Sequence, residues 1–421
     1  MRRPENIVHQ TIRIRITIAP KASSRITHMF ATFFRSPRRL ALAAILGVLA
    51  GCASGPEAPP PEGETGIATT PPPVAPSAPG ISRTQGNARW VAADWSELPG
   101  WSQDEVLRAW PSLLRSCNRP TPVWVASCAS ALALRDPDEW RVRSWLQDHL
   151  QPWRIESLEG QATGMATGYF EPLIEASRLP KPGFMIPLYG PPADLGQRKP
   201  WFSRAQIESE PQARAALRGR EIAYVANPLD ALVLHIQGSG RLEIIEPDGR
   251  KRLVRAAFAG HNDQAYKSVG KWLVERGAFT LDQASWPAIK AWAAANPARV
   301  SEMLNANPRY VFFREEALPD VTAGPVGAQG VPLTPGRSIA VDKTSVPYGT
   351  PVWIDTTEPQ PWAAAPPPPK PLQRLVVAQD TGTAIVGAVR ADYFWGWGEG
   401  AEDRAGRMKQ PLRMWALAPR Q

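Results

Sequence analysis

Three aspartates near the C-terminus have the residue type and the setting that acid–base chemistry requires. Asp342, Asp380 and Asp392 lie at or just beyond the ends of short apolar runs, in a region rich in glycine. The runs Leu375–Ala378 and Ala384–Gly387 predict strands. An aspartate in this position commonly caps a turn. If the three converge on a cleft instead, burial raises the pKa of a carboxyl group and makes it a general acid.

Several other motifs occur in a fixed order along the chain. They are Gly168-Tyr-Phe-Glu-Pro, Gln237-Gly-Ser-Gly, Gly260-His-Asn, Tyr266-Lys-Ser-Val-Gly, Asn307-Pro-Arg-Tyr-Val-Phe-Phe, Gly336-Arg-Ser-Ile-Ala-Val-Asp and Gln379-Asp-Thr-Gly. With the three aspartates they resemble the membrane-bound lytic murein transglycosylase A family, which carries a C-terminal "3D" domain, a double-psi β-barrel named for three aspartates. The resemblance covers roughly Trp90 to Pro419. One motif alone is weak, whereas this many in order is specific.

The resemblance implies a lytic transglycosylase that acts on peptidoglycan glycan strands. Such an enzyme cleaves the β-1,4 bond between N-acetylmuramic acid and N-acetylglucosamine and leaves 1,6-anhydromuramic ends. The family's single catalytic carboxylate is matched by Asp392, which would serve as acid and then as base, with Tyr393, Phe394 and Trp395 building a desolvating pocket around it. Asp380 would support it by hydrogen bonding or electrostatics. No cofactor and no metal are implied.

Polar groups beside glycines and one aromatic ring are the candidates for substrate contact. An aromatic face can stack on a sugar ring, and hydroxyl and amide groups can bind sugar hydroxyl and N-acetyl groups. The predicted contacts are Tyr169, Gln237, Ser239, Thr381, Gly382 and Trp395. Asp342 is expected to hold barrel loops together. The family usually has a second glycine where this chain has Thr383, so the sequence departs from the pattern beside Asp380.

Two other functions remain open at this level. The chain could be a non-catalytic lipoprotein that clamps peptidoglycan in the same groove. It could also be a hydrolase in which Asp380 and Asp392 act together, because two-carboxylate glycosidases place their carboxyl groups about 5–10 Å apart.

These residues must be positioned by a mainly β fold with flanking helices (α+β). We expect residues 88–172 and 317–421 to form a discontinuous double-psi β-barrel (3D) domain. Residues 173–316 would form an inserted β-rich domain, with the substrate groove between the two. Predicted strands include Leu232–Gln237 in the inserted domain, and Tyr310–Phe313 as a strand returning to the first domain.

Helices are expected mainly before the first barrel strands. The predictions are a helix capped at Ser102 and running to Leu113, then Pro122–Leu134 and Asp138–Leu150, and later Ala265–Glu275, Leu281–Ala294 and Ala298–Leu304. The proline-rich stretch from Thr356 to Gln373 predicts a surface loop without chemistry.

The N-terminus has the pattern of a bacterial lipoprotein signal. Arginines at 35, 38 and 39 precede an apolar run, which ends in Leu49-Ala50-Gly51-Cys52. The run of about eleven residues is too short to span a bilayer. We therefore expect residues 1–51 to be removed, with translation starting at Met29, and Cys52 to be lipidated. The alternative is an ordinary signal with a chance cysteine. Ala53 favours the periplasmic face of the outer membrane.

The segment after Cys52 reads as a tether. Residues 52–87 are rich in Pro, Gly, Ser and Thr and predict a disordered linker. The formal net charge of +9 does not indicate nucleic-acid binding, because nine of the 48 basic residues fall in residues 1–51 with a single acid, Glu5. The expected partners are glycan strands and, through the lipid anchor, a membrane. Other cell-wall enzymes are possible partners, but no motif in the sequence identifies them.

Two further cysteines, Cys117 and Cys128, lie eleven residues apart. In an exported chain this spacing favours a disulfide over two buried thiols. A metal site is not expected, because no His lies nearby and no CxxC pair is present.

Overall fold

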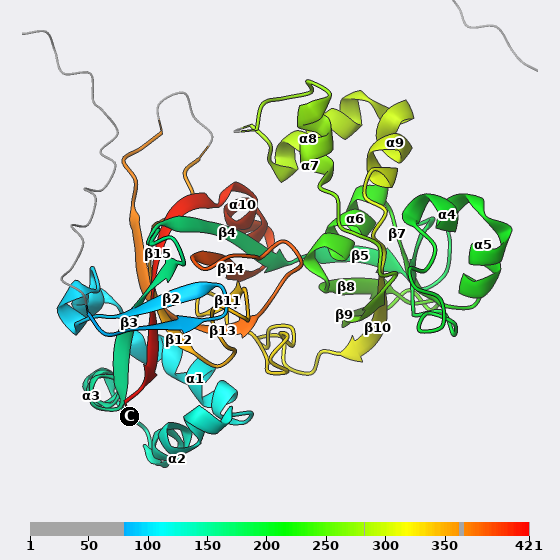
Figure 1. Cartoon of the computed structure of the whole chain (residues 1–421). Coiled ribbons are helices and arrows are strands. Elements are labelled where there is room, and N and C mark those ends of the chain that lie inside the picture. Colours follow the sequence, from blue (N-terminus) through cyan, green and yellow to red (C-terminus); the bar gives the residue numbers. More distant parts are fainter. Residues whose placement is uncertain (1–79, 282, 362–365, 421) are drawn as a thin grey trace, which may run out of the picture. The chain divides into compact units, whose positions relative to one another are not determined.

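The computed structural model describes residues 80–281, 283–361 and 366–420, and their strands form two sheets (Figure 1). The larger sheet has nine strands in the order β1-β2-β3-β15-β12-β13-β11-β14-β4. Their bounds are β1 Ser82–Gln85, β2 Ala88–Ala92, β3 Leu150–Ser157, β4 Gly164–Glu171, β11 Ser338–Val341, β12 Pro351–Thr357, β13 Pro371–Asp380, β14 Arg390–Trp397 and β15 Lys409–Pro419.

Six of these strands close into a barrel. The long strand β15 pairs with β12 at one side and with β4 at the other, so that β15, β12, β13, β11, β14 and β4 form a ring of hydrogen-bonded neighbours. Two of the pairs, β11 with β13 and β14 with β4, are parallel. The expected mainly β fold, with a barrel and flanking helices, is confirmed.

The barrel strands bury apolar side chains on both of their faces. In β13, Val376 and Ala378 belong to a cluster inside the barrel, whereas Leu375 and Val377 belong to a second cluster shared with the helices. Side chains alternate between the two faces of a strand, so a continuous apolar run predicts burial on both sides. The helices that cover the outer face are α1 Trp110–Cys117, α2 Val125–Ala133 and α3 Glu139–His149.

The first helix begins later than expected. Short 3₁₀ turns occupy Trp101–Gln103 and Val106–Ala109, and α1 starts only at Trp110. The Ser102 side chain therefore caps no α-helix. In contrast, Asp138 caps α3 by accepting a hydrogen bond from the Arg141 N–H at 2.8 Å. A disulfide joins Cys117 of α1 to Cys128 of α2, with an S–S distance of 2.07 Å.

The smaller sheet has six strands in the order β10-β9-β8-β5-β7-β6. Their bounds are β5 Leu173–Ser177, β6 Ile186–Tyr189, β7 Glu221–Val225, β8 Gly240–Ile245, β9 Lys251–His261 and β10 Val311–Ala317. The helices of this part are α4 Arg204–Ser209, α5 Pro211–Leu217, α6 Pro228–Gln237, α7 Val269–Glu275, α8 Trp286–Ala295 and α9 Val300–Asn305. All of these strands lie between the two chain segments that build the barrel.

Two predictions for this part were wrong. Residues 232–237 belong to helix α6, because Asn227 caps its start through the Leu229 N–H and Gly238 ends it in a left-handed conformation with φ +80°. The apolar composition of this run is compatible with a strand, but the two caps favour a helix. The strand β10 does not return to the barrel; it pairs with β9 in the six-stranded sheet.

Three further predictions also need correction. Residues 384–387 form no strand, since the Gly387 N–H donates to the Asp342 carboxylate at 3.0 Å and holds this segment as a loop. The segment predicted as a tether to residue 87 already contains β1, which pairs with β2. The proline-rich loop is shorter than expected, because β12 runs to Thr357 and β13 begins at Pro371.

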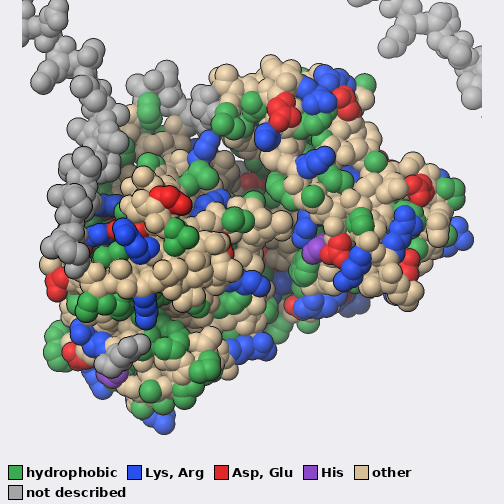
Figure 2. Space-filling model, viewed as in Figure 1, with side chains coloured by type: hydrophobic (Ala, Val, Ile, Leu, Met, Phe, Trp, Pro, Cys, Tyr) green, Lys and Arg blue, Asp and Glu red, His purple; other side chains and the backbone are tan. Residues whose placement is uncertain are grey.

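The signal peptide, the start at Met29, the lipidated Cys52 and most of the tether lie outside the described residues. Among the residues that are described, no helix is both long enough and apolar enough to cross a membrane. Figure 2 shows acidic and basic side chains interspersed on the face in view, and not one continuous basic surface.

Candidate active site

Asp392 lies inside strand β14 and not just beyond a strand end, which corrects the sequence-based position. It stands directly opposite Ala340 of β11 and Thr167 of β4. Directly opposed residues point to the same face of a sheet. The small Ala340 side chain therefore lies beside the carboxyl group, and Thr167 flanks its other side. The Asp392 side chain is half-buried on this face.

A short chain of hydrogen bonds fixes the Asp392 carboxyl group. The Thr167 hydroxyl donates to Asp392 Oδ1 at 2.6 Å, and Arg390 Nη2 donates to the same hydroxyl oxygen at 2.9 Å. The Arg390 guanidinium is itself held by the carbonyl of Ala391 at 2.7 Å. Because Arg390 occupies a lone pair of Thr167, the hydroxyl hydrogen is directed toward Asp392.

Burial raises the pKa of Asp392 to about 6, against the opposing effects of the Thr167 hydrogen bond and the Arg390 charge; the nearby Asp380 carboxylate raises it further. A carboxyl group with such a pKa is partly protonated near neutral pH. It can give a proton to a leaving oxygen and, once ionised, take one back.

Asp380 ends strand β13 and lies on the other side of β11, also opposite Ala340. Both of its oxygens already accept hydrogen bonds, Oδ1 from the Ala328 N–H at 2.9 Å and Oδ2 from the Tyr169 hydroxyl at 3.1 Å. Burial raises the pKa of this carboxyl group, while the donors from Ala328, Thr381 and Tyr169 act in the opposite direction. Both Asp380 oxygens thus accept hydrogen bonds, whereas only Oδ1 of Asp392 accepts one from the residues described.

The aromatic wall of the site comes from Tyr169 and Phe394. Their ring centroids are 5.1 Å apart, and Phe394 follows Asp392 by two residues on the same face of β14. Burial raises the pKa of the Tyr169 hydroxyl well above its usual value, so Tyr169 remains a hydrogen-bond donor. Of the three aromatic residues expected to desolvate Asp392, only Phe394 lies on this face.

Tyr393 and Trp395 point to the opposite face of β14. Tyr393 belongs to the buried barrel cluster, and the Trp395 ring packs against it with centroids 4.8 Å apart. A Cβ on Gly168 would lie 2.7 Å from Trp395 Nε1, so glycine is required for this close packing. Trp395 thus lies on the face of β14 opposite Asp392, where its ring serves the packing of β14 against β4, and this placement argues against a substrate contact beside Asp392.

The remaining predicted contacts have different surroundings. Thr381 follows Asp380, but its hydroxyl donates to the Val341 carbonyl at 2.7 Å, and Gly382 begins a turn closed by the Ile385 N–H. Gln237, at the end of α6, accepts the Phe170 N–H at 3.2 Å and so lies against the strand that carries Tyr169. Ser239 is half-buried in the turn between α6 and β8.

Asp342 holds loops together, as expected. Its Oδ1 accepts from the Thr344 N–H at 3.0 Å and the Thr344 hydroxyl at 2.6 Å, and its Oδ2 accepts from the Gly387 N–H at 3.0 Å and from Asn87 at 3.5 Å. Burial alone would raise the pKa of Asp342, but these donors outweigh it and the pKa is lowered.

Sequence reasoning missed Thr167 and Arg390. Strand periodicity places each on the face of a candidate residue, because Arg390 precedes Asp392 by two residues and Thr167 precedes Tyr169 by two residues. It does not report the pairing of Thr167 with Asp392 across the sheet. Sequence reasoning also missed the buried ion cluster around Glu171, which receives Arg241 at 2.8 Å and Arg255 at 2.6 Å. Both arginines also donate to the Ala323 carbonyl, which fixes the segment leading to Ala328.

Comparisons with known proteins assign most of the chain to two known domains. Residues 165–314 match the MltA specific insert domain, and residues 337–418 match the 3D domain. The chain is 34% identical over 290 residues to membrane-bound lytic murein transglycosylase A of Vibrio cholerae, covering 66% of this chain and 73% of that one. The structure of the lytic transglycosylase LtgG of Burkholderia pseudomallei is similar, with 43% identity, a TM-score of 0.54 and coverage of 82% of this chain and 98% of that one.

A further similar structure is that of Escherichia coli MltA with bound chitohexaose. It has 26% identity and a TM-score of 0.61, and the match covers 82% of this chain and 96% of that one. The identity and coverage of the match to the Vibrio relative are high enough to assign the family. The chain belongs to the membrane-bound lytic murein transglycosylase A family.

Proposed function

We propose that this protein is a peptidoglycan lytic transglycosylase in which Asp392 is the single catalytic acid and base. The observation that carries the assignment is a half-buried carboxyl group whose pKa is raised to about 6 and which receives one directed hydrogen bond from Thr167. Family membership supplies the reaction class, and the related E. coli enzyme binds chitohexaose, a glycan chain.

In the proposed reaction, protonated Asp392 gives its proton to the oxygen that links C1 of N-acetylmuramic acid to N-acetylglucosamine. That C1–O bond breaks, and the muramic C6 hydroxyl oxygen forms a new bond to C1. The Asp392 carboxylate then takes the C6 hydroxyl proton, which regenerates the acid. Water is not consumed, because the attacking hydroxyl belongs to the substrate and is held next to C1 by binding.

Asp380 and Tyr169 support this assignment by their hydrogen bonding. Since both oxygens of Asp380 accept donors, this carboxyl group is better suited to hold the Ala328 loop and the Tyr169 ring than to attack a sugar. The same engagement argues against a hydrolase with two equivalent carboxylates. Tyr169, Gln237, Ser239, Thr381 and Gly382 remain proposed contacts of the glycan.

Mass spectrometry of the sugar ends released from purified murein tests the function. We expect 1,6-anhydromuramic ends from the wild-type protein. Reducing ends would show that a water molecule had attacked C1 and would support the two-carboxylate hydrolase. Binding to murein without any released product would support the non-catalytic clamp.

We further propose a two-domain arrangement and a lipid anchor. The barrel domain comprises residues 88–172 and 317–421, and the insert comprises residues 173–316, in line with sheet membership. Cys52 would carry the lipid at the periplasmic face of the outer membrane. Cys52→Ala should then release the protein from the membrane fraction. Equal retention of the wild type and this variant would contradict lipidation at Cys52.

A further inference from the structure

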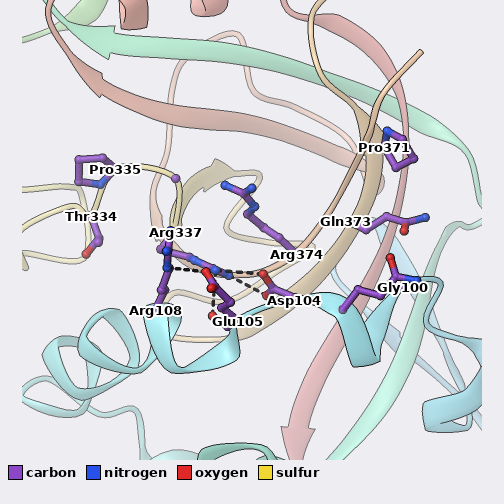
Figure 3. Close-up of a pocket in the computed structure, with 12 residues that line it drawn as sticks. Gly100, Asp104, Glu105, Arg108, Thr334, Pro335, Arg337, Pro371, Gln373 and Arg374 are labelled. Atoms are coloured by element: carbon purple, nitrogen blue, oxygen red, sulfur yellow. Dashed lines mark hydrogen bonds and ion pairs between the residues drawn. The ribbon is translucent and has the colours of Figure 1, made fainter. Parts of the chain in front are cut away.

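A polar pocket lies outside the catalytic face. Its volume is about 450 Å³, and its lining comes from the turns before α1, the loop before β11 and the start of β13 (Figure 3). Tyr393 connects the pocket to β14, because its hydroxyl donates to the Gly336 carbonyl at 2.8 Å. Side chains alternate along a strand, so Tyr393 and Asp392 point to opposite faces of β14. The pocket is therefore separate from the proposed acid.

The floor of the pocket is a buried ion pair between Arg337 and Asp104, in which each charge is neutralised by the other. Arg337 donates to both oxygens of Asp104, at 2.7 and 2.9 Å, and also to the carbonyls of Leu375 and Glu105. At the exposed rim, Arg108 pairs with Glu105 at 2.6 Å. Arg337 and Arg108 are thus each paired with a carboxylate of the protein.

Arg374 differs from both. Within the described part of the chain its side chain forms no ion pair and one hydrogen bond, which runs from Nη1 to the Tyr393 hydroxyl at 2.9 Å. Its Nε is buried and lacks a partner among those residues. Figure 3 shows its guanidinium in the pocket beside the Arg337–Asp104 pair. A half-buried guanidinium with unused donors is the group that recognises a planar anion through two parallel hydrogen bonds.

We propose that this pocket binds a carboxylate through Arg374. Three arginines and two carboxylates line it, so one added negative charge matches the unpaired arginine. A dianion such as sulfate would meet Asp104 and Glu105 with its second charge. The ligand class is therefore a monocarboxylate, which could be a small free acid or a carboxylate on a peptide stem of murein. This inference goes beyond the proposed function and does not depend on glycan cleavage.

The test is an NMR titration of the arginine Nε–Hε resonances of the whole mature protein with sodium acetate, at ionic strength held constant with sodium chloride. We expect a saturable shift of the Arg374 resonance and a weaker response to sulfate. Arg374→Gln should weaken acetate binding at least about tenfold, the effect of one charge-assisted hydrogen bond. Arg250→Gln, in an exposed turn outside the pocket, is the matched control and should leave binding unchanged.

The wild-type titration also stands alone if Arg374→Gln fails to fold. The absence of a saturable Arg374 shift up to about 0.1 M acetate, a concentration far above a millimolar dissociation constant, would overturn the proposal. Equal acetate binding by the wild type and a folded Arg374→Gln would overturn it as well.

Retention on murein with and without its peptides separates the two sources. If Arg374→Gln lowers retention only on peptide-bearing murein, the ligand is a stem carboxylate. If retention is unaffected while acetate binds, the ligand is a small free carboxylate.

Discussion

Asp342 and Asp392 are the same residue type on the same barrel, yet their surroundings give them opposite properties. Asp342 accepts four hydrogen bonds, and its pKa is lowered. Asp392 accepts one short bond from Thr167 on a half-buried face, and its pKa is raised to about 6. The number of donors, and not burial alone, separates a structural carboxylate from one that can act as an acid.

The largest difference is expected in activity. Asp392→Asn should lower the rate of murein cleavage by about 10²–10⁴ or more, because an amide can neither donate the proton nor take it back. Asp342→Asn should leave the rate per folded molecule within a few-fold of the wild type. Release of anhydro-muropeptides, normalised to folded protein, measures both. An active Asp392→Asn beside an inactive Asp342→Asn would reverse the two roles.

The stabilities of the same two variants should move in opposite directions at neutral pH. A raised pKa means that Asp392 contributes stability below its unfolded value of about 3.9, and that this stability is lost as pH rises through about 6. Asp392→Asn should therefore be more stable than the wild type at pH 7.5, by up to about 3 kcal/mol, and this gain should vanish near pH 4.

The contribution of Asp342 to stability depends on pH in the opposite direction. Its lowered pKa contributes stability above the ordinary value, and that contribution is lost as pH falls through the lowered one. Both oxygens face donors, so the amide of Asp342→Asn must turn its NH₂ toward an N–H, at a cost of about 1–3 kcal/mol at neutral pH. Urea unfolding at pH 4 and 7.5 measures both variants. Changes of the same sign at pH 7.5 would contradict the contrast.

Asp380 should show an intermediate effect. Asp380→Asn cannot accept from both Ala328 and Tyr169 without directing its NH₂ at one donor. We expect a loss on the order of tenfold in kcat/KM, equivalent to about 1.4 kcal/mol, because the change disturbs positioning and not proton transfer. Steady-state kinetics on isolated glycan strands provide the measurement. A loss as large as that of Asp392→Asn would indicate that both carboxylates take part in the chemistry.

The smallest effect concerns Thr167. Its hydroxyl favours the ionised form of Asp392, so Thr167→Val should shift the falling alkaline limb of kcat/KM to higher pH by under about one unit. Thr167→Ser keeps the hydroxyl and is the matched control. Other charged or titratable groups facing Asp392 are Arg390, Asp380 and Tyr169, and both variants leave them in place. An unchanged alkaline limb in Thr167→Val would show that Thr167 does not influence the pKa of Asp392.

The barrel was expected from the family resemblance, and its strands were predicted well where the sequence evidence was local. The apolar run Leu375–Ala378 predicted a strand, and the structure places it inside β13. The assignment of α6 as a strand failed because a short apolar run has the same composition in a helix and in a strand, and the caps Asn227 and Gly238 were not weighed.

The site was predicted less completely because its contacts join strands distant in sequence. Thr167 meets Asp392 across 225 residues, and no local pattern reports that pairing. Proximity in sequence puts Trp395 near Asp392 but does not put the two side chains on the same face. Strand alternation places Trp395 on the face opposite Asp392, whereas Tyr169, from a distant strand, lies on the same side as Asp392 and Phe394.

The most direct test is a site-resolved titration of the aspartate carboxyl carbons by NMR in the folded wild-type protein. The contrast between the two aspartates predicts a midpoint near 6 for Asp392 and a midpoint below the ordinary aspartate value for Asp342. Assignment through the Asp392→Asn and Asp342→Asn spectra identifies each signal. A midpoint for Asp392 at or below about 3.9, the ordinary value, would contradict its role as the acid that is protonated near neutral pH.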